Sequence, residues 1–307
     1  MSRTRKLFNV VLLLLIAIIV CIIIPRYDDT VTQIKQIINI YSSNNIKIPS
    51  ITNNPKKEKF KTVKQTDNFE PKNMDDLKSI YYTVLNNGWD DFTFYCPKEY
   101  ENCYNDVTTL ANSKEFVDLI NNYVSPYNTC KTYHTSIEGN VKIRLTIERI
   151  YTEEEIISLK VNAKRILNEL NINKNNVDKE DLRKIHNYLI SNITYDLDYV
   201  QDINNISPSS KAIGAITNGK AVCSGYTDLF AILLDELNIP NFKVASDTHI
   251  WNVVYFDNEW LHVDVTWDDD EVNNYNSYNF FLITTDKLIS KDVKEHNFKK
   301  ELYLELN

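Results

Sequence analysis

The sequence predicts an α+β fold, and two patterns in its C-terminal half carry that prediction. Apolar residues recur at the spacing of a buried helix face after Cys223, and this run ends at Asn238 and Pro240. Residues 249–256 and 260–267 are rich in Val, Trp, Tyr and Thr and flank a turn at 257–259. A pair of segments of this composition is typical of a β-hairpin.

A smaller α+β segment is predicted ahead of these elements, over residues 75–150. Its expected elements are two helices at 77–87 and 113–123, a Cys-containing loop between them, and strands near 132–136 and 141–151. Two long amphipathic helices follow, at 153–171 and 177–192, and lead into the cysteine helix. We therefore predict one catalytic domain over residues 151–307, preceded by the segment 75–150 as a lead-in.

Cys223 is the first candidate functional residue. The turn signal Asn218-Gly219-Lys220 precedes it, so its thiol is expected at a loop-to-helix junction that a substrate can reach. The helix dipole and the unpaired N–H groups of a first turn favour thiolate over thiol. A lone cysteine before a helix is nevertheless more often a small buried hydrophobe than a nucleophile.

The predicted hairpin supplies a base and an acid for this thiol. If its loop is two residues long, Phe256 pairs with Glu259, and His249 lies diagonal to Asp264 on one face of the sheet. A three-residue loop would place the two side chains on opposite faces unless a bulge intervened. Cysteine, histidine and aspartate together fit the general pattern of an activated nucleophile with an oriented base.

The other histidines are weaker candidates. His262 shares the hairpin face of Asp264 and is the main rival for the base. His186, on an amphipathic helix, is expected to be a structural histidine, and the sequence offers no partner for His134 or His296.

Three motifs resemble those of the bacterial transglutaminase-like domain, a branch of the papain-like cysteine transferases and peptidases. They are Lys220 to Tyr226 around the cysteine, His249 to Asn252, and Trp260 to Asp269. Flanking pieces, residues 185–188, 193–196 and 278–282, extend the likeness over about residues 181–285. The resemblance implies Cys223 as nucleophile, His249 as general base and acid, and Asp264 as its orienter. It also implies a core in which the cysteine helix packs on an antiparallel sheet.

Metal, nucleotide and nucleic-acid functions have little support in the sequence. There is no Cys-x-x-Cys pair and no His-Glu-x-x-His helix, and the five glycines form no phosphate loop, so we predict neither metal nor cofactor. Residues 75–307 carry 22 basic and 37 acidic side chains. An acidic domain of this kind is a poor nucleic-acid binder.

The N-terminus predicts attachment to a membrane. Residues 7–24 are apolar except for Asn9, and Arg3, Arg5 and Lys6 precede them. This pattern favours a single membrane span with a cytoplasmic stub over residues 1–25 and an outward-facing remainder. A cleaved signal peptide is the alternative. Residues 26–74 are predicted to form a flexible basic linker.

Cysteine usage agrees with an outward location. Cys96 and Cys103 are seven residues apart and can close a short disulfide loop in an oxidising compartment. The alternative is that both are small buried residues in a reduced protein. Cys130 is left over, and Cys223 must stay reduced to act.

These observations predict thiol-dependent acyl transfer on peptide or protein amides at the outer face of a membrane. The Cys223 backbone N–H is expected to supply part of an oxyanion hole, with the second donor unassigned. The alternative is a non-catalytic envelope scaffold that binds peptides or polysaccharide on the same fold.

Overall fold

The computed structural model describes residues 70–139, 141–199, 206–270, 275–276, 278–292 and 294–306. All of them belong to one compact unit, residues 53–307, distinct from residues 1–52. The predicted membrane segment 7–24 and most of the predicted linker 26–74 lie outside the described residues. Within the described ranges, no helix has the length and apolar character needed to cross a bilayer.

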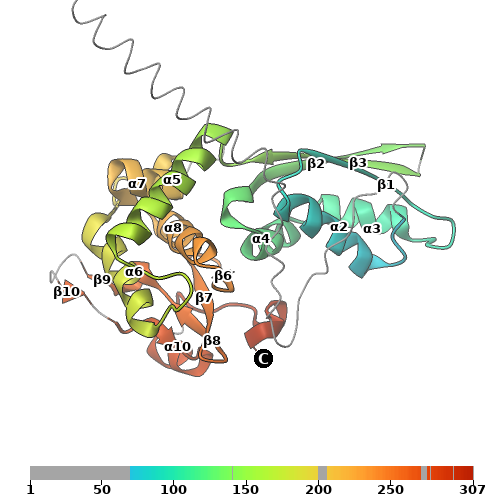
Figure 1. The fold of residues 1–307 in the computed structure, drawn as a ribbon. Helices are drawn as coiled ribbons and strands as arrows, with labels where there is room; N and C mark the ends of the chain where they lie inside the picture. The colour runs from blue at the N-terminus through green and yellow to red at the C-terminus, as the bar shows by residue number, and fades with distance from the viewer. Residues whose placement is uncertain are drawn as a thin grey trace, which may run out of the picture. The chain divides into compact units, whose positions relative to one another are not determined.

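The lead-in segment pairs helices with a three-stranded antiparallel sheet of order β1-β3-β2 (Figure 1). Its elements are α2 Met74–Asn86, β1 Asp91–Tyr95, α3 Cys103–Ala111, α4 Lys114–Tyr123, the 3-10 turn η1 Pro126–Asn128, β2 Cys130–Glu138 and β3 Lys142–Arg149. The two predicted helices and two predicted strands are confirmed. Strand β1 and helix α3 occupy the region predicted as a loop, because the apolar residues there fill the core under the sheet.

A disulfide joins Cys96 to Cys103, with their Cα atoms 5.6 Å apart. It closes the loop between β1 and α3, as the spacing of the two cysteines predicted. Cys130 is a buried free thiol, and Cys223 is free and partly exposed. Cys223, the predicted nucleophile, is therefore not part of the disulfide.

The second part of the fold holds helices around a four-stranded sheet of order β11-β8-β7-β6, in which all neighbours are antiparallel. Its helices and 3-10 turns are α5 Glu153–Glu169, α6 Lys179–Asn192, η2 Pro208–Ser210, α7 Ala212–Asn218, α8 Cys223–Glu236, α9 Val265–Asp268, α10 Thr285–Lys291, η3 Lys300–Leu302 and η4 Leu304–Leu306. Its strands are β4 Thr194–Tyr195, β5 Lys220–Ala221, β6 Asn241–Ala245, β7 Ile250–Phe256, β8 Glu259–Val263, β9 Asp269–Asp270, β10 Tyr275–Asn276 and β11 Phe281–Ile283.

Helix α8 lies at the centre of this part and is buried from Gly225 to Leu234. It contacts β6 and β7 on one side and α5, α6 and α7 on another (Figure 1). The sequence predicted one buried face, but helices and sheet enclose α8, so its polar residues Thr227 and Asp228 are buried as well. This arrangement confirms a cysteine helix packed on an antiparallel sheet.

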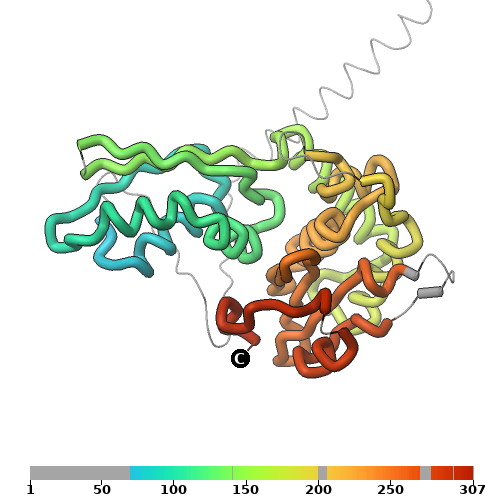
Figure 2. Tube along the Cα trace, turned by 180° about the vertical axis from the view of Figure 1, so that it is seen from behind, coloured from blue at the N-terminus to red at the C-terminus, as the bar shows by residue number. Residues whose placement is uncertain are grey.

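The two faces of the four-stranded sheet pack against two different hydrophobic cores. Val254 and Val263 pack with α8, whereas Trp251 and Val253 pack with the core that includes the lead-in helices. The chain after α10 continues to the C-terminus (red in Figure 2), and its Phe298 packs edge-on against Trp251, with ring centroids 5.7 Å apart. Strand β7 therefore contributes to both cores through alternate side chains.

The hairpin β7–β8 has a two-residue loop, which is the first of the two lengths that the sequence left open. Asp257 and Asn258 both have positive φ, and Phe256 pairs with Glu259, as expected for a loop of this length. The predicted second strand, 260–267, is wrong after residue 263, where the chain turns into the short helix α9. The reason is Asp264, whose carboxylate accepts the Trp267 N–H at 3.1 Å and caps that helix.

Candidate active site

Cys223 is the first residue of α8, and only Val222 separates it from the end of β5. The neighbouring residues hold it in place: the Val222 N–H donates to the Ser209 carbonyl at 2.8 Å, and the Ser224 hydroxyl donates to the Ser210 carbonyl at 2.9 Å. Gly225 permits this close packing, because a Cβ there would lie 2.6 Å from the Ser209 oxygen. The thiol is therefore presented at the N-terminus of a helix that these contacts hold in place.

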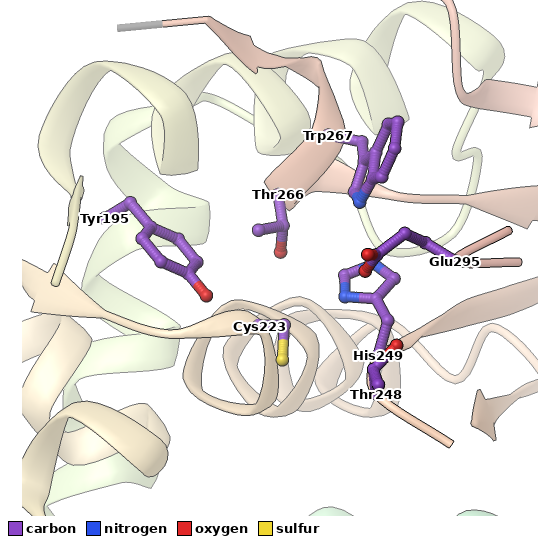
Figure 3. A pocket seen from close by; sticks show the side chains of 7 residues that line it. All are labelled: Tyr195, Cys223, Thr248, His249, Thr266, Trp267 and Glu295. Carbon is purple, nitrogen blue, oxygen red and sulfur yellow. The ribbon is translucent and has the colours of Figure 1, made fainter. Parts of the chain in front are cut away.

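His249 precedes β7 and is 7% exposed. Its Nε2 lies 2.5 Å from Asp264 Oδ2. The ring lines the same pocket as Cys223, which helps to raise the pKa of His249, and Nδ1 is the ring nitrogen that Asp264 does not engage. Figure 3 shows the imidazole beside the cysteine. The Asn252 side chain, which donates to the Thr227 carbonyl at 3.0 Å, ties β7 to α8 and thereby sets the distance between His249 and the thiol.

Asp264 lies between β8 and α9 and is 1% exposed. Its Oδ1 accepts the Trp267 N–H, and its own N–H donates to the Phe280 carbonyl at 2.9 Å. Its Oδ2 lies between two imidazoles, those of His249 and His296. The structure thus brings all three predicted site residues together, and it adds a second histidine to the carboxylate.

His262, the rival base, has a different role. Its Nδ1 accepts the Trp251 indole N–H at 2.9 Å, and its Nε2 lies 3.1 Å from the Thr285 hydroxyl. Burial, together with the charge of His296, lowers the pKa of His262 to about 3. His262 is therefore a neutral packing residue. His186, predicted to be structural, is fully buried with its Nε2 3.0 Å from Asp268 Oδ2.

Opposing effects set the charge states of the pair. Burial alone would lower the pKa of His249, but the charge and hydrogen bond of Asp264, with a hydrogen bond to Cys223, raise it to about 10. Burial alone would raise the pKa of Asp264, but His249 and His296 outweigh it and lower the pKa to about 2. The site therefore holds an imidazolium and a carboxylate at neutral pH.

This pair predicts a pH-dependent stability. The folded protein holds the His249 proton above its ordinary pKa of 6.5, so the stabilisation is complete below about pH 6.5 and lost as the pH rises through about 10. Urea unfolding of the parent chain and of His249→Gln should differ by a free energy that declines across this window. Parallel pH profiles for the two proteins would contradict the assignment.

A pocket of about 280 Å³ opens beside the thiol. It is lined by Tyr195, Cys223, Thr248, His249, Thr266, Trp267 and Glu295 (Figure 3). Tyr195 reaches it because β4 pairs in parallel with β5, the strand before the cysteine, and its hydroxyl points into the pocket from the side opposite His249.

The sequence did not lead us to predict several of these residues as part of the site. Tyr195 and Thr266 lie within the motifs that carry the resemblance, and that placement was an available signal. Glu295 and His296 carry no local signal, because they approach the site only through the fold. Sequence reasoning therefore found Cys223, His249 and Asp264, but it missed two residues within the motifs and those supplied by the C-terminal segment.

The ligand atoms of His249, Asp264 and His296 lie within 4.8 Å of one another, and histidine and aspartate both bind zinc. In this arrangement both imidazoles are hydrogen-bonded to the same carboxylate oxygen. The three groups therefore satisfy one another through protons, and we assign them no ion.

Part of the chain is similar in sequence to a known family. Residues 166–265 match the sequence profile of the transglutaminase-like superfamily, a range that begins and ends before the predicted 181–285. No curated protein matches the chain.

Two solved structures are similar. A crystal structure of a TGase is 14% identical, with a TM-score of 0.35 over 61% of this chain and 54% of that chain. A candidate cysteine protease from Cytophaga hutchinsonii is 13% identical, with a TM-score of 0.26 over 44% of this chain and 61% of that chain. This chain therefore aligns with only 54% and 61% of the length of these two solved chains. Residues 166–265 are thus similar to the transglutaminase-like superfamily.

Proposed function

We propose that this chain is a thiol-dependent acyltransferase or hydrolase acting on peptide or protein amides. The observation that carries the proposal is the line of contacts from Cys223 through His249 to Asp264, at the edge of an open pocket. A binding module would have no chemical need for a thiol, a base and an orienting acid in this order.

In the proposed reaction the Cys223 thiolate attacks the amide carbonyl carbon and forms a C–S bond. The C–N bond then breaks as the His249 imidazolium gives its Nδ1 proton to the leaving amine. An amine or a water molecule attacks the resulting thioester, its proton passes to Nδ1, and the C–S bond breaks. This step restores the thiolate and the imidazolium, while Asp264 holds the ring in one orientation throughout.

Two donors are suitably placed for the oxyanion that forms during attack. The Cys223 N–H is the first of α8, so it has no partner within the helix. The Tyr195 hydroxyl points into the same pocket from the other side (Figure 3). We assign these two groups as the oxyanion donors, which fills the position that the sequence left open.

We also propose that the enzyme acts at the outer face of a membrane, anchored by residues 7–24. The positive flank at Arg3, Arg5 and Lys6 supports that orientation. The disulfide between Cys96 and Cys103 supports it independently, because such bonds persist in oxidising compartments.

The test is mass spectrometry of envelope proteins and envelope peptides incubated with the purified full-length chain. Crosslinking releases ammonia, a loss of about 17 Da, deamidation adds about 1 Da, and hydrolysis cuts the peptide. Any of these products, absent with Cys223→Ala, supports the proposal and identifies the acyl acceptor.

Alkylation by iodoacetamide separates this proposal from a scaffold. If Cys223 is a nucleophile activated by His249, it should react with the reagent at neutral pH faster than free cysteine does. An unreactive Cys223 under these conditions, together with no change in any envelope substrate, would favour the scaffold.

A further inference from the structure

His296 lies outside the family match and is fully buried against the site. It follows α10, in a turn where the Asp292 carboxylate accepts the N–H groups of Lys294 and Glu295 at 3.2 and 2.9 Å. This turn places the imidazole of His296 between two carboxylates. Its Nδ1 lies 3.0 Å from Asp292 Oδ2, and its Nε2 lies 2.9 Å from Asp264 Oδ2.

The hydrogen-bond geometry defines the charge of this ring. The pKa of Asp264 and that of Asp292 are both below their ordinary value, so both carboxylates are ionised at neutral pH. A neutral imidazole has one N–H and one lone pair, and the lone pair would then face an anionic oxygen. The two carboxylate oxygens that face the ring therefore pair best with an imidazole that carries a proton on both nitrogens.

Aromatic rings enclose the same imidazole. The ring of His296 stacks on Phe280 with centroids 5.1 Å apart and meets Trp251 and Trp267 edge-on at 4.8 and 5.0 Å. Aromatic rings around a cation stabilise it through their quadrupoles. The surroundings are therefore suited to an imidazolium that is buried but not solvated.

This charge bears on His249 because both imidazoles use the same oxygen of Asp264. The two rings are 5.5 Å apart, close enough for one positive charge to oppose a second. His296 also neutralises part of the Asp264 charge that holds the proton on His249. Both effects make His249 a better acid toward the leaving amine, because proton transfer is most efficient when the acid is not too weak.

We propose that His296 is a positioning residue: a buried imidazolium that shares Asp264 with His249 and weakens the hold of that carboxylate on the His249 proton. The ionisable groups that face it are Asp264, Asp292 and His249, with His262 affected by its charge. The role in catalysis rests on the proposed acyl transfer, whereas the charge state of the ring does not.

The experiment is an NMR titration of the full-length chain with nitrogen-labelled histidines, assigned through single His→Gln variants. We expect His296 to keep both ring nitrogens protonated at neutral pH. In His296→Gln, which retains a neutral donor, the titration of His249 should move upward by on the order of one pH unit, because a nearby positive charge is gone. The alkaline limb of kcat/KM should move in the same direction, with a loss in kcat larger than any change in KM.

The matched control is His262→Gln, because His262 is equally buried and also contacts Trp251. This variant should leave the titration of His249 in place. Should His296→Gln fail to fold, Asp292→Asn keeps the histidine and removes one carboxylate, so His296 should lose its proton at lower pH.

A single protonated nitrogen on His296 at neutral pH would overturn the proposal, as would a His249 titration unmoved in the folded variants. Because the titration needs no turnover, a chain with a doubly protonated His296 and no enzymatic activity would refute the proposed function alone.

Discussion

Replacing Cys223 by alanine is expected to abolish turnover, and replacing His249 by alanine should do the same. Each loss should exceed about 10⁴-fold in kcat, since residues of such a constellation act as a unit. Asp264→Asn should retain a small fraction of the activity, because an amide can still accept the Trp267 N–H and cap α9 but cannot neutralise an imidazolium. Turnover of a peptide amide measures all three variants.

The control for this series is His262→Ala, and the folded state of each variant is checked by near-ultraviolet circular dichroism. His262 packs against Trp251 and Phe298, so its removal should lower the Tm while the remaining folded protein stays active. If His262→Ala loses turnover and His249→Ala keeps it, our assignment of the base is wrong.

Breaking the buried ion pair between Lys243 and Asp228 should produce the largest loss of stability among the variants proposed here. Lys243 of β6 and Asp228 of α8 form a bridge at 2.8 Å, with side chains 5% and 6% exposed, and Tyr151 donates to the same carboxylate at 3.0 Å. Lys243→Met should lower the free energy of unfolding by about 3–5 kcal/mol, because an uncompensated buried charge remains. Urea unfolding measures the change.

The double variant Asp228→Asn with Lys243→Met provides the comparison. Since it removes both charges, its cost should be well below the sum of the two single costs. Simple additivity of the two single variants would show that the bridge does not couple the cysteine helix to the sheet.

The elements that local patterns specify were predicted from the sequence. The spacing of apolar residues located α4, α5, α6 and α8, and the turn pair Asp257-Asn258 set the register of the hairpin. That register placed His249 and Asp264 on one face. The same reasoning extended β8 too far, because Val265, Thr266 and Trp267 favour strand by composition, whereas the cap formed by Asp264 starts a helix there.

The disulfide between Cys96 and Cys103 was also predicted correctly, because it too depends on local spacing. Seven residues separate Cys96 from Cys103, so the pairing is decided within a short loop. The elements on either side of this loop were not predicted. Strand β1 and helix α3 form there because their apolar residues join a core built from distant segments.

Residue order alone thus predicts the candidate constellation, because Cys223, His249 and Asp264 lie in motifs whose spacing and periodicity are local properties. The tertiary structure decides what surrounds them. It brings Tyr195 to the pocket through the pairing of β4 with β5, and it brings His296 to Asp264 from 32 residues further along the chain. No periodicity links those positions, since packing of the C-terminal segment against the sheet, and not local hydrogen bonding, sets their approach.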